Sequence, residues 1–270
     1  MADHMNILFA FFMTLIAGLS TGIGSLLSLL TKKTNAKFLA VSLGFSAGVM
    51  IYVSMVELLG QSQATLAAIM GGRKGHLISV ISFFGGMLLI SLIDKLIPSE
   101  QNPHEIKSPE DAASDVLSQN KNLLRTGMFT ALALAIHNFP EGMATFISAL
   151  QDLSVAIPVV VAIAIHNIPE GIAVAIPIYY ATGNRKKAFL YSFLSGLAEV
   201  VGAFVGFLLL RPFMNDTMFG IVFAAVAGIM VFISFDELLP AAREYGEHHL
   251  SVYGLVAGMA VMAISLLLFL

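Results

Sequence analysis

One eight-residue motif occurs twice and brings three kinds of polar side chain into apolar surroundings. The octet Ala-Ile-His-Asn-x-Pro-Glu-Gly fills residues 135–142 and again 164–171, and the two copies differ only at Phe139 and Ile168. Each copy lies inside a strongly apolar run. A charged group near the centre of a bilayer costs at least ~3 kcal/mol without partners. Histidine, asparagine and glutamate kept in such a place are therefore candidates for a functional site.

Helical geometry gathers the polar groups of each octet on one side. Residues four apart share a face of a helix, so the histidine and the glutamate of each octet lie side by side, and the asparagine stands ~100° round from the histidine. The proline lacks an N–H, which leaves the carbonyl oxygen of Ile136 or Ile165 without its helical donor. The side chains that result are six candidate ligands: His137, Asn138, Glu141, His166, Asn167 and Glu170.

A divalent transition-metal ion suits these groups. Zinc binds histidine nitrogen and carboxylate oxygen in sets of four, and two antiparallel helices that each give one histidine and one glutamate supply such a set. Asparagine and carbonyl oxygens are harder ligands that also suit iron and manganese. Glu199 lies midway along a later apolar run, with no lysine or arginine close by, and we assign it to the same site. Because these side chains outnumber the needs of one ion, we expect one or two bound ions.

The composition is that of a membrane protein. Hydrophobic residues make up 57% of the 270 residues, charged residues only 11%, and the mean hydropathy is +0.87. A soluble domain carries about 25% charged residues. No cysteine is present, which excludes disulfides and thiolate metal ligands. We expect an all-α polytopic membrane protein that forms a single transmembrane domain over residues 1–270.

Apolar runs of ~20 residues, the length that spans a bilayer as a helix, occur eight times. They lie near 5–30, 38–60, 77–97, 124–150, 153–180, 187–210, 218–239 and 250–270. The longest polar break, 98–122, is rich in Pro, Ser, Asp, Glu and Asn and is predicted to be a flexible loop. Lysine and arginine concentrate in the breaks after odd-numbered spans, which places those breaks, 98–122 among them, in the cytoplasm and both termini outside.

A second internal similarity relates two distant spans. Residues 44–59 resemble residues 224–239, with Ser54 matching Ser234 and Glu57 matching Glu237. Spans two and seven cross the membrane in opposite senses, as do the two octet spans, which predicts inverted repeats in a 3+2+3 arrangement of eight transmembrane helices. Duplication without a functional role is the alternative. The two glutamates are predicted near the ends of their spans, in a structural or a gating role.

Glycines spaced four apart predict seams where helices pack closely, either inside the bundle or in a homodimer. These pairs are Gly18/Gly22, Gly44/Gly48 and Gly202/Gly206.

The paired octets, Glu199 and the eight spans together resemble the ZIP family of divalent-metal transporters over essentially the whole chain, and within it the bacterial zinc transporters. The resemblance implies uptake of zinc, and of iron, manganese, cobalt or cadmium, across the bacterial cytoplasmic membrane. It also implies that the metal ligands are His137, Asn138, Glu141, His166, Asn167, Glu170 and Glu199. Many members have a histidine-rich loop between spans three and four, where this chain has only His104.

Other functions fit the sequence less well. An intramembrane zinc protease would need His-Glu-x-x-His, but Asn138 and Asn167 occupy the position of the general base. A nucleotide-driven pump would need a Gly-x-x-x-x-Gly-Lys-Ser/Thr loop, which the chain lacks. We therefore expect divalent ions and the lipid bilayer as partners, and neither ATP nor nucleic acid. The intramembrane histidines could also pair with the glutamates simply to hold helices together.

Overall fold

A computed structural model describes residues 2–30, 36–96, 116–151, 153–210, 215–245 and 248–268, and every element in these ranges is a helix. Two elements, η1 and η4, are π-helical and continue the α-helices on either side of them. The elements are α1 (Ala2–Leu30), α2 (Ala36–Tyr52), η1 (Val53–Leu58), α3 (Leu59–Met70), α4 (Gly72–Leu96), α5 (Val116–Gln151), α6 (Leu153–Thr182), α7 (Arg185–Leu210), α8 (Asp216–Ile233), η4 (Ser234–Leu238), α9 (Leu239–Tyr245) and α10 (His248–Leu268).

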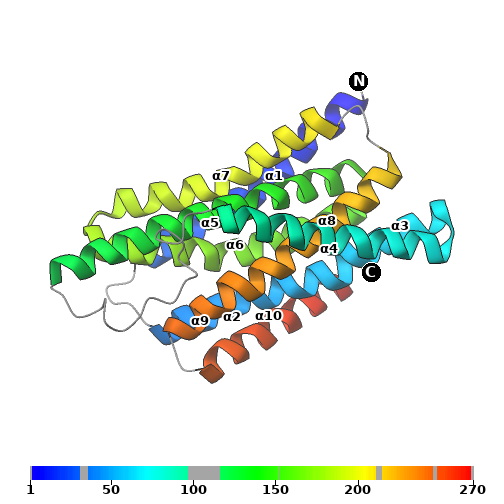
Figure 1. The fold of residues 1–270 in the computed structure, drawn as a ribbon. Coiled ribbons are helices and arrows are strands. Elements are labelled where there is room, and N and C mark those ends of the chain that lie inside the picture. Colours follow the sequence, from blue (N-terminus) through cyan, green and yellow to red (C-terminus); the bar gives the residue numbers. More distant parts are fainter. Residues whose placement is uncertain are drawn as a thin grey trace.

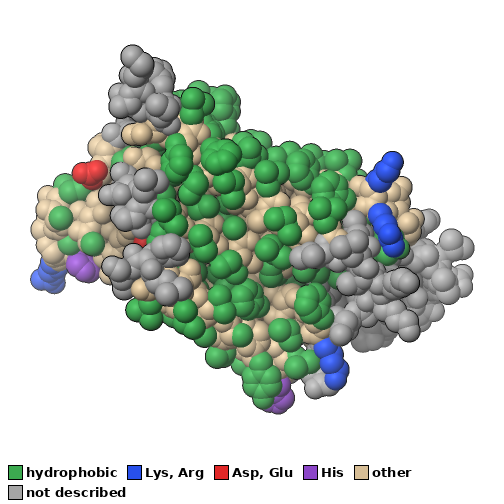
Figure 2. Space-filling view, turned by 180° about the vertical axis from the view of Figure 1, so that it is seen from behind, with side chains coloured by type: hydrophobic (Ala, Val, Ile, Leu, Met, Phe, Trp, Pro, Cys, Tyr) green, Lys and Arg blue, Asp and Glu red, His purple; other side chains and the backbone are tan. Residues whose placement is uncertain are grey.

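Within the described residues, seven helical segments are long and apolar enough to cross a membrane. The remaining predicted span, 124–150, lies within the continuous helix α5. Hydrophobic side chains cover the middle of the face in Figure 2, and the lysines and arginines drawn there lie towards its ends. Large apolar side chains such as Leu88, Leu208 and Leu267 are more than half exposed. A surface of this kind belongs in lipid, which confirms a multi-pass membrane protein.

Glycine and asparagine mark the helix boundaries that the structure describes. Gly71 (φ 86°) separates α3 from α4, and Gly183 (φ 63°) follows α6, because a residue without a Cβ adopts these positive φ angles without strain. The Asn215 side chain caps α8 by accepting a hydrogen bond of 2.9 Å from the Met218 N–H. Such a cap satisfies one of the donors that a helix leaves free at its start.

The second predicted span is longer than the sequence analysis placed it. Its helix does not end near residue 60 but continues through η1 and α3 to Met70. The polar residues there are helix-compatible, and Ser62 is hydrogen-bonded to Ser79 of α4 at 2.8 Å in the interior. Glu57 therefore lies inside a long helix rather than at the end of a span. Span seven likewise continues beyond Glu237 to Tyr245.

The predicted loop 98–122 differs from the structure in its last part. Residues 116–122 form the first turns of α5. The sequence Val-Leu-Ser-Gln-Asn-Lys-Asn has no proline or glycine, so it can extend the helix that follows it. Residues 97–115, which include His104, lie outside the described residues.

The helices form an elongated bundle with α1 and α7 along one side and α2 and α10 along the other (Figure 1). α1 packs on α6 and α7, and α7 packs on α5. In the other part, α2 packs on α10 and α4 packs on α8. Exchanging α1 with α7, α2 with α8, α4 with α10 and α5 with α6 turns the pair α1–α7 into itself and each of the other pairs into another observed pair. The pairings thus follow the correspondence that the internal repeats predict.

The predicted glycine seams lie at helix crossings inside the bundle. A Cβ built on Gly44 or Gly48 would overlap the backbone of α10, at Ser251 or Leu255. The remaining seam glycines meet another helix in the same way or face a side chain: Gly18 meets Gly196, Gly202 meets Phe139, Gly22 faces Phe193 and Gly206 faces Met143. Small residues at these points let two backbones approach closely, which favours internal packing as their role.

Candidate metal centre

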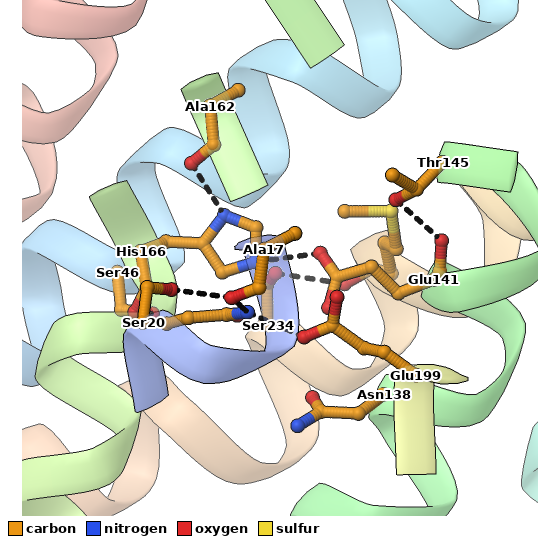
Figure 3. A network of polar contacts seen from close by, with 12 residues as sticks. Ala17, Ser20, Ser46, Asn138, Glu141, Thr145, Ala162, His166, Glu199 and Ser234 are labelled. Carbon is orange, nitrogen blue, oxygen red and sulfur yellow. Dashed lines mark hydrogen bonds and ion pairs between the residues drawn. The ribbon is translucent and has the colours of Figure 1, made fainter. Parts of the chain in front are cut away.

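Helices α5, α6 and α7 bring the candidate ligands into the interior of the bundle. Six of the predicted side chains are fully buried, with no exposed surface: Asn138, Glu141, His166, Asn167, Glu170 and Glu199. In Figure 3 the polar ends of Glu141, His166 and Glu199 point toward one another. The seventh, His137, lies in α5, but its side chain is outside the described residues.

Glu141 and His166 make a close contact across the two octet helices. The Nε2 atom of His166 lies 2.6 Å from Oε1 of Glu141. The other ring nitrogen, Nδ1, lies 3.0 Å from the Ala162 carbonyl oxygen, so Nδ1 must carry a proton and donate it. This hydrogen bond fixes the ring and leaves Nε2 directed at the carboxylate. Metal-binding histidines are held by a backbone carbonyl in the same way.

The two asparagines tie the octets to the helices that flank them. The Asn138 amide donates a hydrogen bond of 3.1 Å to the Ser195 carbonyl of α7. The Asn167 amide donates one of 3.0 Å to the Ala17 carbonyl of α1, and it also donates to Oε1 of Glu199. One asparagine thus joins three helices and positions the third carboxylate.

Carboxyl groups and acceptor atoms are in excess at this centre. Glu199 interacts electrostatically with Glu141 and Glu170, so three buried carboxylates lie close together. Oε2 of Glu199 and Oδ1 of both asparagines have no hydrogen-bond partner among the described residues. Buried polar atoms in native proteins are almost always paired. Unsatisfied acceptors beside three carboxylates are the arrangement that a cation would complete.

A family model described as ZIP Zinc transporter matches residues 94–266. The chain belongs to the ZIP zinc transporter family. Relatives named "Zinc transporter ZupT" match nearly the full chain. The one from Clostridium perfringens is 60% identical over 280 residues, 99% of this chain and 98% of its own. That from Streptococcus mutans is 63% identical over 260 residues, 96% of this chain and 97% of its own.

Membership of the ZIP family makes this chain a transport protein and not an enzyme, since the relatives are named transporters. The intramembrane metalloenzyme that the sequence left as an alternative is thereby excluded. The relative from Oceanobacillus iheyensis, also named "Zinc transporter ZupT", is 61% identical over 264 residues, 97% of this chain and 98% of its own.

The centre of this ZIP chain joins the two octet helices. The histidines and glutamates of both helices were expected to surround an ion together, and Glu141 of α5 meets His166 of α6. No three His, Asp or Glu side chains among the described residues stand close enough to enclose an ion as they are. The six predicted ligands whose side chains are described are all buried, and ion binding by the predicted set stays a prediction.

Sequence reasoning missed the part of this ZIP centre that comes from α1 and α2. Ala17 accepts from Asn167 through its backbone carbonyl, and the Ser46 hydroxyl of α2 donates to the His166 carbonyl at 3.3 Å. A backbone carbonyl leaves no trace in a side-chain motif. The glycine pair Gly18/Gly22 was the available signal, since it marked the face of α1 that packs on other helices.

Proposed function

We propose that this chain takes up zinc across the bacterial cytoplasmic membrane into the cytoplasm, through one or two ion sites on α5, α6 and α7. The observation that supports this most directly is a fully buried group of three carboxylates whose surroundings include unpaired acceptor oxygens. The proposed ligands are His137, Asn138, Glu141, His166, Asn167, Glu170 and Glu199. The named relatives support zinc as the substrate.

The chemistry of the ligands supports a range of divalent ions. Imidazole and carboxylate are good zinc ligands, and the amide oxygens of Asn138 and Asn167 are hard donors that suit iron and manganese. The chain has no cysteine, so no thiolate holds the ion too tightly for release. We therefore extend the proposal to iron, manganese, cobalt and cadmium. A competition series against zinc uptake ranks them.

The bilayer supplies enough energy for cation entry. A membrane potential favours inward movement by ~2.3 kcal/mol per charge per 100 mV, so neither ATP nor a second domain is needed. We place both termini outside and the lysine-rich breaks, 98–122 among them, in the cytoplasm. A 3+2+3 inverted repeat, supported by the exchanged helix pairings, gives the two related arrangements that alternating access requires.

Uptake of zinc by the purified chain in liposomes tests the proposal. We expect zinc-dependent flux from the wild type and a loss of about 10- to 100-fold in Glu141→Gln, which keeps the shape of the side chain and removes its charge. Ser148→Ala is the matched control, because Ser148 is buried on the same helix and, within the described part of the chain, its hydroxyl bonds the Ala144 carbonyl alone. Absence of flux from the wild type would refute the transport proposal.

The alternative in which Glu141 and His166 merely join two helices has a different signature. A structural pair predicts that Glu141→Gln lowers the thermal midpoint of the metal-free protein and that zinc does not shift the midpoint of the wild type. A binding site predicts that zinc raises the wild-type midpoint and that this increase shrinks in Glu141→Gln.

A further inference from the structure

The crossing of α1 and α7 relates the two repeats residue by residue. Gly18 of α1 and Gly196 of α7 face each other: a Cβ on Gly18 would lie 2.6 Å from the Gly196 carbonyl oxygen, and one on Gly196 would lie 2.5 Å from that of Gly18. These two glycines are therefore equivalent. Three residues further along each helix stand Thr21 and Glu199.

Contacts to the octet helices extend the same equivalence. A Cβ on Gly171 of α6 would overlap the Thr21 carbonyl, and a Cβ on Gly142 of α5 would overlap the Glu199 carbonyl. Each of these glycines directly follows the octet glutamate. Thr21 thus lies against the second octet as Glu199 lies against the first.

Hydrogen bonds one turn earlier on each helix agree with this equivalence. Ala17, four residues before Thr21, accepts from the Asn167 amide at 3.0 Å. Ser195, four residues before Glu199, accepts from the Asn138 amide at 3.1 Å. Residues four apart share a face of a helix, so Thr21 lies on the same face of α1 as Ala17, just as Glu199 lies on the same face of α7 as Ser195. Thr21 therefore lies on the side of α1 that faces the octet helix α6.

The Thr21 side chain is buried without a partner. The residue has no exposed surface, and its Oγ1 has no hydrogen-bond partner among the described residues. Threonine inside a helix usually bonds the carbonyl four residues back, as Thr14 of α1 does with Ala10 at 3.0 Å. The hydroxyl lies against α7, where a Cβ built on Gly196 would be 2.9 Å from Oγ1. A buried hydroxyl that makes no such bond is available to a ligand.

We propose that Thr21 is a substrate-facing, specificity-determining residue of the transport site. It holds in the first repeat the position of Glu199 in the second, and it presents a neutral hydroxyl oxygen to the transported divalent ion. This inference rests on the proposed function. A neutral group at this position keeps the site at three carboxylates, which favours release of the ion, and adds one hard oxygen donor to the ligand set.

Thr21→Val tests the hydroxyl without changing the shape of the side chain. We expect zinc uptake to fall about tenfold, as for other groups that support a metal site, and manganese uptake to fall further because a hard oxygen is lost. The thermal midpoint of the metal-free protein stays the same or rises, since an unpaired buried hydroxyl is removed. Thr21→Ser restores uptake.

Two results would overturn the proposal. One is wild-type uptake and wild-type zinc-to-manganese preference in Thr21→Val. The other is a fall in uptake accompanied by a lower midpoint of the metal-free protein, which is what a purely structural hydroxyl predicts. The wild type and Glu199→Gln are measured in the same series. If the wild type transports no zinc, the proposed function fails; if it does and Thr21→Val is unchanged, only this inference fails.

An exchange of the two residues tests the equivalence itself. Glu199→Thr alone is expected to lose uptake about 100-fold, and the double variant Thr21→Glu/Glu199→Thr to recover at least tenfold of that loss. Thr21→Gln/Glu199→Thr is the control, because glutamine has the size of glutamate without its charge. Equal uptake in the two double variants would overturn the equivalence. Should neither double variant fold, Thr21→Val decides alone, since it leaves the packing unchanged.

Discussion

The two octet helices have nearly the same sequence but different hydrogen bonds. In α5 the Asn138 amide makes one bond, to the Ser195 carbonyl of α7. In α6 the Asn167 amide makes the equivalent bond to Ala17 of α1 and a second one to the Glu199 carboxylate. Backbone contacts are thus repeated, whereas side-chain contacts are not.

This difference has its source outside the octets. α7 contributes Glu199 where α1 contributes Thr21, and only the longer, charged side chain reaches an octet asparagine. The repeated octet therefore accounts for the equivalent bonds of Asn138 and Asn167 to backbone carbonyls. The unrepeated residue Glu199 accounts for the bond that only Asn167 makes. Four predictions test this view, in order of decreasing expected effect.

The largest effect is expected when the unrepeated charge is removed. Glu199→Gln keeps the bulk of the side chain, and we expect zinc uptake in liposomes to fall about 100-fold because a ligand loses its charge. Ser148→Ala is the control, because this buried residue of α5 donates its hydrogen bond to the Ala144 carbonyl of its own helix at 2.8 Å. Equal losses in the two variants would mean that Glu199 has no special place at the centre.

The repeated backbone contacts are tested by adding one methyl group. Gly142→Ala and Gly171→Ala each force a Cβ into the backbone of α7 or α1, at an overpacking cost of about 1–3 kcal/mol of stability. We expect similar drops in thermal midpoint, with a greater loss of uptake in Gly142→Ala because that contact holds the Glu199 backbone. Gly60→Ala meets no atom within 4 Å and is expected to be stabilising. A tolerated Gly142→Ala would contradict close packing of α5 on α7.

Variants of the two asparagines test whether the bond from Asn167 to Glu199 contributes to the site. Leucine has nearly the shape of asparagine, so Asn167→Leu and Asn138→Leu each remove an amide with little change in packing. Asn167→Leu also removes the hydrogen-bond donor of the Glu199 carboxylate. Since a hydrogen bond to a charged group contributes about 1.5–3 kcal/mol, we expect zinc uptake to be about tenfold lower in Asn167→Leu than in Asn138→Leu. If uptake is equally low in both, the bond to Glu199 does not contribute to the site.

The smallest effect is expected in the π-helical segments, where Ser54 and Ser234 occupy matching positions. The Ser234 hydroxyl donates to the Met230 carbonyl at 2.7 Å, whereas the buried Ser54 hydroxyl has no partner among the described residues. We expect Ser234→Ala to lower stability by about 0.5–1.5 kcal/mol and Ser54→Ala to leave it unchanged or raise it. Thermal midpoints in detergent distinguish the two. A larger loss in Ser54→Ala would show that its hydroxyl is paired in solution.

Much of the fold followed from local patterns. Hydropathy located the apolar runs, because a chain that crosses a bilayer needs ~20 apolar residues whatever its neighbours are. The continuation to Met70 and the start of α5 at Val116 were missed, since a polar residue such as Ser62 is typical of a loop until a neighbouring helix buries it.

The candidate site also has a part that the sequence predicted and a part that it did not. Glu141, His166 and Glu199 could be chosen from the sequence because charged groups in apolar runs are expensive and conspicuous. Their partners could not be chosen, because a pair such as Glu141 with His166 depends on how α5 crosses α6. The Ala17 carbonyl of α1 could not be chosen either, because every residue of a helix has a backbone carbonyl.

The sequence by itself determined that this is a membrane protein with a doubled set of candidate metal ligands, because apolar length, residue type and repetition are properties of the chain. Only the tertiary structure decided which of those side chains meet. The reason is that helices without a Cβ at their crossings approach within backbone contact, and the register of that contact selects the neighbours.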